Sequence, residues 1–173
     1  MMSALRLWLS VGLLVLTGLS TPCAVAEVAH AAVKARPSDA QLVERGRYLA
    51  RIAGCNDCHT PGYAQSGGNV PEKDWLVGDR LGWHGPWGTT YPANLRLYMQ
   101  KLTEEQWIKV AQTVQMRPPM PWFALRDMTQ ADLRALYRFI RHLGPAGEAA
   151  PTYLPPDQTP KGPVVSFPQP PKK

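Results

Sequence analysis

Residues 55–59 read Cys55-Asn56-Asp57-Cys58-His59, and this short stretch decides how the rest of the chain is interpreted. It is the C-x-x-C-H pattern by which a c-type haem is attached. Two thiols three positions apart on a helical turn reach the two vinyl groups on one edge of the porphyrin. The histidine that follows points its imidazole at the iron from the same side. We therefore expect one covalently bound haem c held by Cys55, Cys58 and His59.

Three other kinds of site could use the same cysteine pair. A structural zinc ion would need four ligands, and no second C-x-x-C or H-x3-H pair completes such a set. A Cys55–Cys58 disulfide is compatible with an oxidising compartment. A thioredoxin-like redox pair would need a βαβ context, which the sequence lacks. None of the three explains His59, so haem attachment is the interpretation that we carry forward.

The first 26 residues have the order of a secretory signal peptide. Arg6 supplies a short positive region, residues 7–19 form an apolar stretch, and Ala24-Val25-Ala26 provides a cleavage site of small residues. The apolar stretch is shorter than the roughly 20 residues of a membrane-spanning helix. We expect cleavage after Ala26, a periplasmic location and no stable membrane span afterwards. An uncleaved N-terminal anchor is the alternative.

The composition of the chain excludes other classes of protein. Its 173 residues fit one domain with an extension, and its 45% hydrophobic and 18% charged residues favour a folded chain. The net charge is +6, but no Lys/Arg run is longer than Lys172-Lys173, so nucleic-acid binding is not expected. Nine of the 18 prolines fall in residues 145–173, which predicts an extended, polyproline-rich or disordered tail. This tail is either a docking strap for a partner or a solvated end.

An iron held by one histidine needs a second axial ligand, and Met120 is our candidate. It lies in the stretch Arg117-Pro118-Pro119-Met120-Pro121-Trp122, where prolines fix φ and stiffen the loop. A stiff loop holds a weak thioether ligand against the metal, and methionine ligation raises the reduction potential, which suits an electron carrier. The alternatives are that Met120 fills a gap in the core, or that His84 in the glycine-rich stretch 82–88 is the ligand.

Capping residues predict three helices. Ser38, Thr103 and Thr129 each begin a capping box or a near match to one. The helices are expected at residues 39–53, 104–114 and 130–143, and Gly144-Pro145 ends the last. In that last helix the arginines at 134, 138 and 141 form a basic stripe. The stripe is either a steering surface for an acidic redox partner or a solvated face.

No strand pattern appears between His59 and Leu102, where the chain is rich in Gly, Pro and Trp. A loop of this length has a physical reason if it wraps a porphyrin that supplies the missing core. Four aromatic residues are its expected packing surface: Trp75, Trp83, Trp87 and Tyr91. The tryptophan N–H groups, the Tyr91 hydroxyl and the Arg96 guanidinium are candidate partners for the haem propionates, with ordinary loop packing as the alternative.

With these motifs the chain resembles the single-domain class I cytochromes c from about Ser38 to Gly144. The resemblance implies an all-α, cytochrome c-like fold of about three to four helices wrapped around one covalently attached haem, with long loops. It implies that the first and last helices cross, with Gly46 close to the last helix near Tyr137. It also implies thioether attachment through Cys55 and Cys58, His59 as the proximal ligand and Met120 as the distal ligand.

A narrower resemblance rests on residues 85–95 and on Met120-Pro121-Trp122. These are similar to the cytochrome subunits that accompany periplasmic alcohol, gluconate or aldehyde dehydrogenases. Such subunits usually carry three haem domains, whereas this chain has one C-x-x-C-H, so only the electron-transfer role is carried over.

These features predict a signal peptide at 1–26, a lead-in at 27–37, a cytochrome c domain at 38–144 and a tail at 145–173. We expect an electron carrier rather than an enzyme, with redox proteins as its partners. A periplasmic dehydrogenase would be the donor, and an oxidase or cytochrome of the respiratory chain would be the acceptor. The alternatives are a tightly bound haem subunit of a dehydrogenase complex, or a haem peroxidase or gas sensor with an open sixth position.

Overall fold

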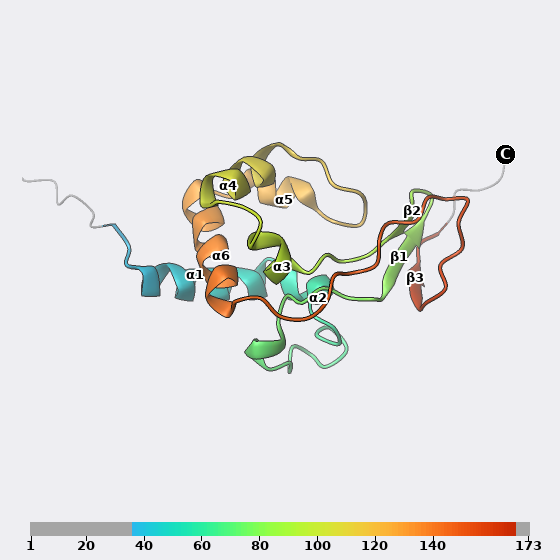
Figure 1. Cartoon of the computed structure of the whole chain (residues 1–173), viewed down its shortest axis with the longest axis horizontal. Coiled ribbons are helices and arrows are strands. Elements are labelled where there is room, and N and C mark those ends of the chain that lie inside the picture. The colour runs from blue at the N-terminus through green and yellow to red at the C-terminus, as the bar shows by residue number, and fades with distance from the viewer. Residues whose placement is uncertain (1–35, 169–173) are drawn as a thin grey trace, which may run out of the picture. The chain divides into compact units, whose positions relative to one another are not determined.

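The computed structural model describes residues 36–168 of the chain (Figure 1). The expected signal peptide and nearly all of the lead-in lie outside these residues. Six helices, one 3-10 turn and three short strands make up the described part: α1 Asp39–Ile52, α2 Cys55–His59, η1 Glu72–Asp74, β1 Gly82–Gly85, β2 Gly88–Thr90, α3 Leu95–Met99, α4 Glu104–Thr113, α5 Trp122–Asp127, α6 Gln130–Leu143 and β3 Val164–Ser166.

The three helices expected from capping residues are confirmed as α1, α4 and α6. Ser38 and Thr103 form complete capping boxes with the glutamines at 41 and 106. The Thr129 side chain accepts a hydrogen bond from the backbone N–H of Asp132 at 3.1 Å. These bonds satisfy N–H groups that a helix start leaves without partners, so each helix begins at the position that its cap dictates.

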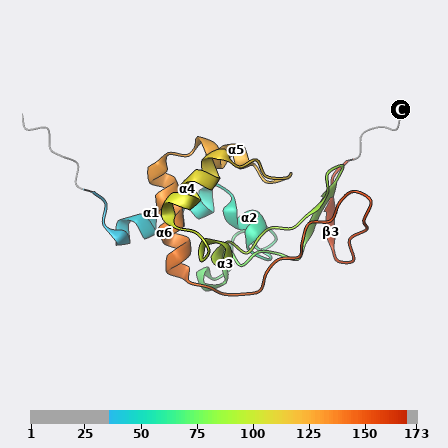
Figure 2. The ribbon, with the colours of Figure 1, turned by 45° about the horizontal axis from the view of Figure 1, so that its top comes forward.

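Helices α1 and α6 cross at Gly46, as the resemblance implies (Figures 1 and 2). A Cβ at Gly46 would lie 2.6 Å from the Cβ of Phe139 and would overlap the carbonyl oxygen of Ala135. These two residues flank Tyr137 in the chain, so α1 meets α6 at the expected level. The contact is on the opposite face of α6 from Tyr137, whose hydroxyl donates to the Leu102 carbonyl. Besides Gly46, the buried residues of the two helices are Leu49, Ala50, Leu133, Ala135, Leu136, Phe139 and Ile140.

The structure corrects the expected number of helices and the expected absence of strands. Three short helices add to the predicted set, which makes six in the described residues rather than three to four. Asn94 begins α3, because its side chain accepts a hydrogen bond from the N–H of Leu97 at 3.0 Å. Asparagine is a strong N-cap residue, so this signal was present in the sequence. The fold remains mostly helical, with a small sheet added.

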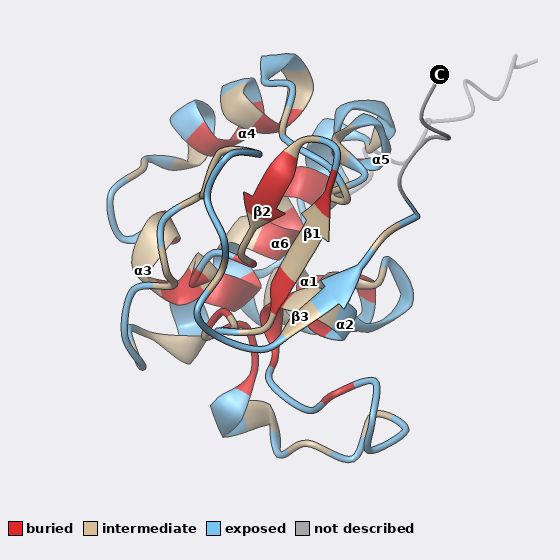
Figure 3. Cartoon of the chain, turned by 90° about the vertical axis from the view of Figure 1, so that its right-hand side faces the viewer, coloured by how far each residue is buried: buried red, intermediate tan, exposed pale blue. Residues whose placement is uncertain are grey.

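The sheet has the order β2-β1-β3, with β1 antiparallel to β2 and parallel to β3. Strand β2 is the most buried of the three and β3 the most exposed (Figure 3). The three strands read Gly-Trp-His-Gly, Gly-Thr-Thr and Val-Val-Ser, so each spans only three or four residues. Alternation over so few residues is too short to stand out as a strand pattern.

Residues 145–168 of the tail contain no helix and make a turn at Pro155–Gln158, and they do not stand apart from the domain. Leu154 forms a backbone bridge with Thr89, and β3 pairs with β1. The tail therefore packs on the hairpin that β1 and β2 form. No helix within residues 36–168 has the length and apolar character to cross a membrane.

Candidate haem site

Cys55, Cys58 and His59 lie on the single turn of α2, directly after α1. Gly54 joins the two helices with φ +71°, a left-handed backbone that glycine adopts without steric cost. Both thiols are free, so the alternative of a Cys55–Cys58 disulfide is wrong for this structure. Cys55 is half-buried and packs against the hydrophobic core. The sharp bend at Gly54 thus presents both thiols and the imidazole from one short helix.

The surroundings of the two thiols disfavour the thiolate form. Burial raises the pKa of the Cys55 thiol to about 11. Burial, together with the carboxylates of Asp57 and Asp79, also raises the pKa of Cys58. A redox-active cysteine pair needs a lowered thiol pKa, so the thioredoxin-like alternative does not fit. In residues 36–168 no group of three or more His, Cys, Asp or Glu side chains could hold a metal ion, which disfavours the zinc alternative.

His59 is buried as a neutral imidazole with the proton on Nδ1, which is the form that an iron ligand requires. Its Nδ1 lies 2.7 Å from the carbonyl oxygen of Ala93. A carbonyl only accepts hydrogen bonds, so Nδ1 carries the proton and Nε2 keeps its lone pair. Burial lowers the pKa of His59, against the opposing effect of the bond to Ala93. The ring is therefore neutral at neutral pH, and it is oriented by the kind of partner that metal-bound histidines use.

The loop after η1 forms backbone hydrogen bonds to His59 and to the segment that contains Ala93, and these bonds hold the two together. The N–H of Gly78 donates to the His59 carbonyl at 2.8 Å, and the N–H of Asp79 donates to the Pro92 carbonyl at 3.1 Å. Gly78 has φ +80°, and a Cβ there would lie 2.7 Å from the backbone nitrogen of Asn94. Only glycine allows this close approach without strain, so Gly78 locks the His59 turn to the segment that carries Ala93.

Two linked hydrogen bonds inside the core, which the sequence did not predict, also position α2. The fully buried Asn56 accepts a hydrogen bond from the hydroxyl of Thr60 through Oδ1 at 2.8 Å. The Thr60 oxygen in turn accepts from the N–H of Leu76 at 2.8 Å. These bonds fasten α2 to the following loop from inside the core. No periodicity marks either residue, so only the fold reveals their part in positioning α2.

Met120 lies at the end of the loop 114–121, directly before the helix α5. Its N–H donates to the carbonyl of Arg117 at 3.2 Å, and its own carbonyl accepts from the N–H of Trp122 at 2.9 Å. The side chain is half-buried and packs against the same hydrophobic core as Cys55. In both Figure 1 and Figure 2 the loop and α2 lie on the same side of the α1–α6 pair. Ligation by Met120 stays a prediction.

His84, the alternative ligand, and two further methionines have structural contacts of their own. Met99 is fully buried in the core. Met128 caps the end of α5 and packs against the same core. The Nδ1 of His84 lies 2.8 Å from the Thr89 hydroxyl on the neighbouring strand. His84 is therefore part of the hairpin's own bonding.

Of the two alternatives left open for Arg96, a propionate partner or ordinary packing, the contacts of Arg96 support packing. Arg96 is buried, and its guanidinium donates to three backbone carbonyls. These belong to Gly144 at 2.6 Å, to Leu143, and to Lys73 at 2.6 Å. Two of these carbonyls stand at the end of α6, where they have no partner within the helix. Arg96 thus closes the C-terminus of α6, which is the packing alternative.

The four aromatic residues of the loop divide between the core and the hairpin. Trp75 is buried, donates to the Val70 carbonyl at 2.8 Å and meets Phe139 edge-on, so it belongs to the protein core. The rings of Trp83 and Trp87 instead contact Phe167 of the tail, at centroid distances of 6.0 and 5.1 Å. Tail residues therefore cover aromatic surface that the sequence had suggested for the porphyrin.

The basic stripe of α6 is largely paired. Arg134 and Arg138 both reach the carboxylate of Glu104, at 2.5 and 2.6 Å. Arg141 donates to the Met99 carbonyl at 3.3 Å. The stripe joins α6 to its neighbours, but Arg134 and Arg138 share one carboxylate and Arg141 donates to a neutral carbonyl, so a net positive charge remains on this face.

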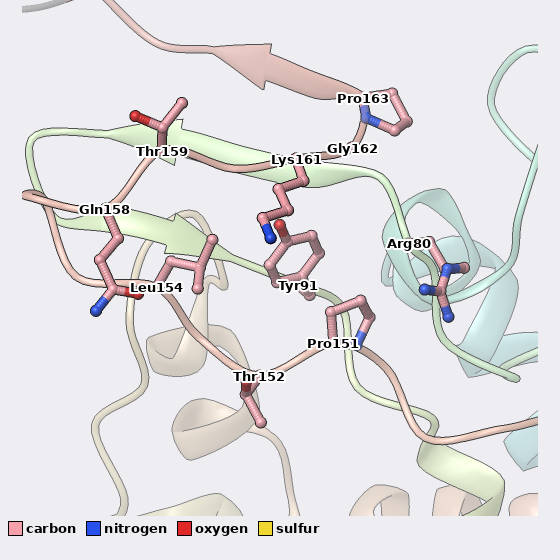
Figure 4. Close-up of a pocket in the computed structure, with 10 residues that line it drawn as sticks. All are labelled: Arg80, Tyr91, Pro151, Thr152, Leu154, Gln158, Thr159, Lys161, Gly162 and Pro163. Atoms are coloured by element: carbon pink, nitrogen blue, oxygen red, sulfur yellow. The ribbon is translucent and has the colours of Figure 1, made fainter.

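A cavity of about 340 Å³ is lined by residues next to the hairpin and by residues of the tail (Figure 4). Tyr91, which follows β2, faces Lys161 and Pro151 from the tail, and Arg80 stands at its edge. Its full lining is Arg80, Tyr91, Pro151, Thr152, Leu154, Gln158, Thr159, Lys161, Gly162 and Pro163. The cavity lies between the hairpin and the tail, and it includes none of the four predicted haem ligands.

The sequence profile of the family described as Cytochrome c matches residues 43–144, more than half of the 173-residue chain. The chain belongs to the cytochrome c family. No curated protein and no solved structure matches it. Cytochromes c bind covalently attached haem c, and the residues Cys55, Cys58 and His59 fit their C-x-x-C-H motif, so this cytochrome carries haem c.

Family membership confirms the cytochrome c-like fold and the haem-based electron-transfer role of the domain. The matched range ends at Gly144, so the tail that packs on the hairpin lies outside it. The two free thiols and the neutral, oriented imidazole fit the attachment of the group on the geometry alone.

Proposed function

We propose that this cytochrome passes single electrons in the periplasm, with His59 and Met120 as the axial ligands of one haem c. The observation that carries the proposal is the α2 turn, where two free thiols and a buried neutral imidazole with a free Nε2 stand together. When bound, the haem iron alternates between its ferric and ferrous states and supplies the one-electron chemistry.

The residues of the chain fix and tune that group. Cys55 and Cys58 hold it covalently, so it stays in place while the redox state changes. The Ala93 carbonyl keeps the His59 ring in one orientation and increases the basicity of Nε2. A thioether from Met120 favours the ferrous state and raises the reduction potential. A filled sixth position also disfavours peroxidase or gas-sensor chemistry, which needs an open one.

The proposed donor is a periplasmic dehydrogenase, and the proposed acceptor is an oxidase or cytochrome of the respiratory chain. Two sequence features support this assignment. One is the predicted signal peptide at 1–26. The other is the similarity of residues 85–95 and 120–122 to the cytochrome subunits of periplasmic alcohol, gluconate and aldehyde dehydrogenases.

The substitution Met120→Ala tests the ligand assignment. We expect the haem to remain attached and the reduction potential to fall by a sizeable part of the roughly 0.8 V range that axial ligands control. The ferrous protein should also bind carbon monoxide. Potentiometry and carbon monoxide difference spectra measure both effects.

Met116→Ala is the matched control, because Met116 also lies in this loop and is also partly buried against the core. The control should keep the potential of the unmodified protein. An unchanged potential in Met120→Ala would rule out Met120 as the ligand, and the reverse pattern would assign Met116.

The native mass of the gently purified, tagged mature protein tests the proposed partners. A species near the monomer mass that accepts electrons from a purified periplasmic dehydrogenase would support a diffusing carrier. Co-purification with a dehydrogenase at fixed stoichiometry would instead make the protein a subunit of that complex. The cofactor of the co-purified enzyme would then identify its class of substrate.

A further inference from the structure

The tail outside the family match packs on the two segments that support the iron ligands. The first residues of the tail contact Asn94, which is next to the residue that orients the His59 ring. The side-chain amide of Asn94 donates to the carbonyls of Ala146 at 2.8 Å and Glu148 at 3.0 Å. Asn94 directly follows Ala93, whose carbonyl orients the His59 ring. The first residues of the tail are therefore fixed to the proximal side of the site.

The tail is next fixed to the hairpin, at a position where the sequence leaves room for it. Thr89 and Leu154 exchange two backbone hydrogen bonds, at 2.8 and 3.0 Å. Gly88 has φ +97°, and a Cβ there would overlap the carbonyl oxygen of Leu154 and lie 3.0 Å from the carbonyl carbon of Pro155. A side chain at position 88 would exclude the tail, so the hairpin is built to receive it.

Tyr153 lies beside this anchor and reaches the loop that carries Met120. Its hydroxyl donates to the carbonyl of Trp87 at 2.7 Å. The guanidinium of Arg117 lies over its ring, 3.9 Å from the centroid. Arg117 is three residues before Met120, and its carbonyl accepts the Met120 N–H at 3.2 Å. One tyrosine side chain thus joins the hairpin to the 114–121 loop.

The stack is a specific contact of this tyrosine. Among the described residues no carboxylate forms an ion pair with Arg117, so the Tyr153 ring is the partner that the structure gives its cation. A planar guanidinium lies flat on an aromatic face and is attracted by its negative quadrupole, an arrangement that a lysine ammonium reproduces poorly. The hydroxyl bond to Trp87 fixes the ring from its other end.

We propose that Tyr153 is a positioning residue for Met120. By stacking on Arg117 while bound to the hairpin, it holds the 114–121 loop where the thioether reaches the iron and resists replacement by other ligands. This inference rests on the proposed Met120 ligation. It gives the tail a role in the redox site itself, rather than as a solvated end or as a strap for a partner.

The test uses the full-length protein with its haem attached. Tyr153→Leu removes both the stack and the hydroxyl, whereas Tyr153→Phe keeps the ring. Phe167→Leu is the control, because Phe167 belongs to the same tail and contacts Trp83 and Trp87. Two quantities are measured: the rate at which carbon monoxide binds the ferrous protein, and the pH at which the ferric protein loses its methionine–iron charge-transfer band.

We expect Tyr153→Leu to bind carbon monoxide at least tenfold faster and to lose the band at a lower pH than the unmodified protein. Tyr153→Phe should restore most of the resistance, because the ring still lies under Arg117. Phe167→Leu should match the unmodified protein in both measurements. Identical behaviour of Tyr153→Leu and Phe167→Leu would overturn the inference.

Arg117→Leu tests the other side of the stack and serves if Tyr153→Leu does not fold. It should reproduce most of the effect of Tyr153→Leu. Adding Arg117→Leu to Tyr153→Leu should change nothing further, because the stack is already lost. Additive effects would overturn the inference. Met120→Ala distinguishes the two proposals: if it behaves like the unmodified protein, the ligand assignment fails. If Met120→Ala loses the band while Tyr153→Leu and Arg117→Leu keep it unchanged, only the positioning role fails.

Discussion

The α1–α6 crossing and the hairpin–tail region are held together by different means. At the crossing, apolar side chains are buried and Gly46 lets the two helix backbones touch. In the hairpin–tail region the contacts are backbone hydrogen bonds and aromatic edges, such as the Thr89–Leu154 bridge and the Phe167–Trp87 contact. The first region buries more apolar surface, so it should carry more of the free energy of unfolding.

This difference suggests that the two regions have different roles: the crossing provides rigidity, and the hairpin–tail region allows local movement. A crossing fixed by packing gives a rigid frame for α2, which follows α1 directly. A region fixed by hydrogen bonds can adjust locally while the frame stays folded, because local opening costs less where few apolar groups are buried. Changes in the crossing should therefore unfold the whole domain, whereas changes in the hairpin should free the tail alone.

The largest expected effect comes from Gly46→Val. A side chain there meets the backbone of Ala135, which cannot move aside as a flexible side chain would. We expect the free energy of unfolding to fall by about 3 kcal/mol, the upper part of the usual range for overpacked cores. Denaturant unfolding of the haem-loaded protein measures it.

Gly162→Ala is the control for this change. No atom lies within 4 Å of a Cβ at Gly162, so its stability should change by no more than about 0.5 kcal/mol. A Gly46→Val protein as stable as this control would mean that α1 and α6 do not cross in contact.

Arg96→Met should have the next largest effect, because it leaves the carbonyls of Leu143, Gly144 and Lys73 without a donor. We expect a loss of about 2 kcal/mol in the free energy of unfolding. The reduction potential should stay unchanged, since Arg96 bonds to backbone rather than to a propionate. Arg80→Met is the control, because Arg80 is exposed and its replacement should leave the free energy of unfolding nearly unchanged. A shifted potential with unchanged stability would restore the propionate role of Arg96.

Gly88→Ala should have the smallest global effect, about 1 kcal/mol, because it acts on the hairpin–tail contact. Its local effect should be large: the Cβ displaces Leu154, so the amide of Leu154 should exchange hydrogen faster and the tail should be cleaved sooner by protease. Gly62→Ala is matched to it, since Gly62 has φ +74° but open space around it. Equal tail protection in both variants would contradict the packing of the tail on the hairpin.

The helical frame could be predicted from the sequence because its signals are local. Ser38, Thr103 and Thr129 stand three residues before their hydrogen-bonding partners, so a short window contains the whole cap. The C-x-x-C-H turn is equally local. The α1–α6 contact is distant in sequence, and its prediction depended on the family resemblance.

The hairpin and its tail could not be predicted in the same way. The pairing of Thr89 with Leu154 and the stack of Arg117 on Tyr153 join residues far apart in the chain, and no periodicity links them. The role of Arg96 was missed for the same reason, because its partners are carbonyls contributed by two other segments. Every residue has a backbone carbonyl, so a hydrogen bond to one cannot be predicted from the residue types in the sequence.

The parallel pairing of β3 with β1 also has a consequence for the order in which the protein forms. A chain is synthesised from its N-terminus, so Cys55, Cys58 and the β1–β2 hairpin exist well before Val164 does. The edge of β1 must therefore wait unpaired until the last described strand arrives. During that interval this edge of the hairpin is open, so the pairing of β3 with β1 is a late step in the folding of the described domain.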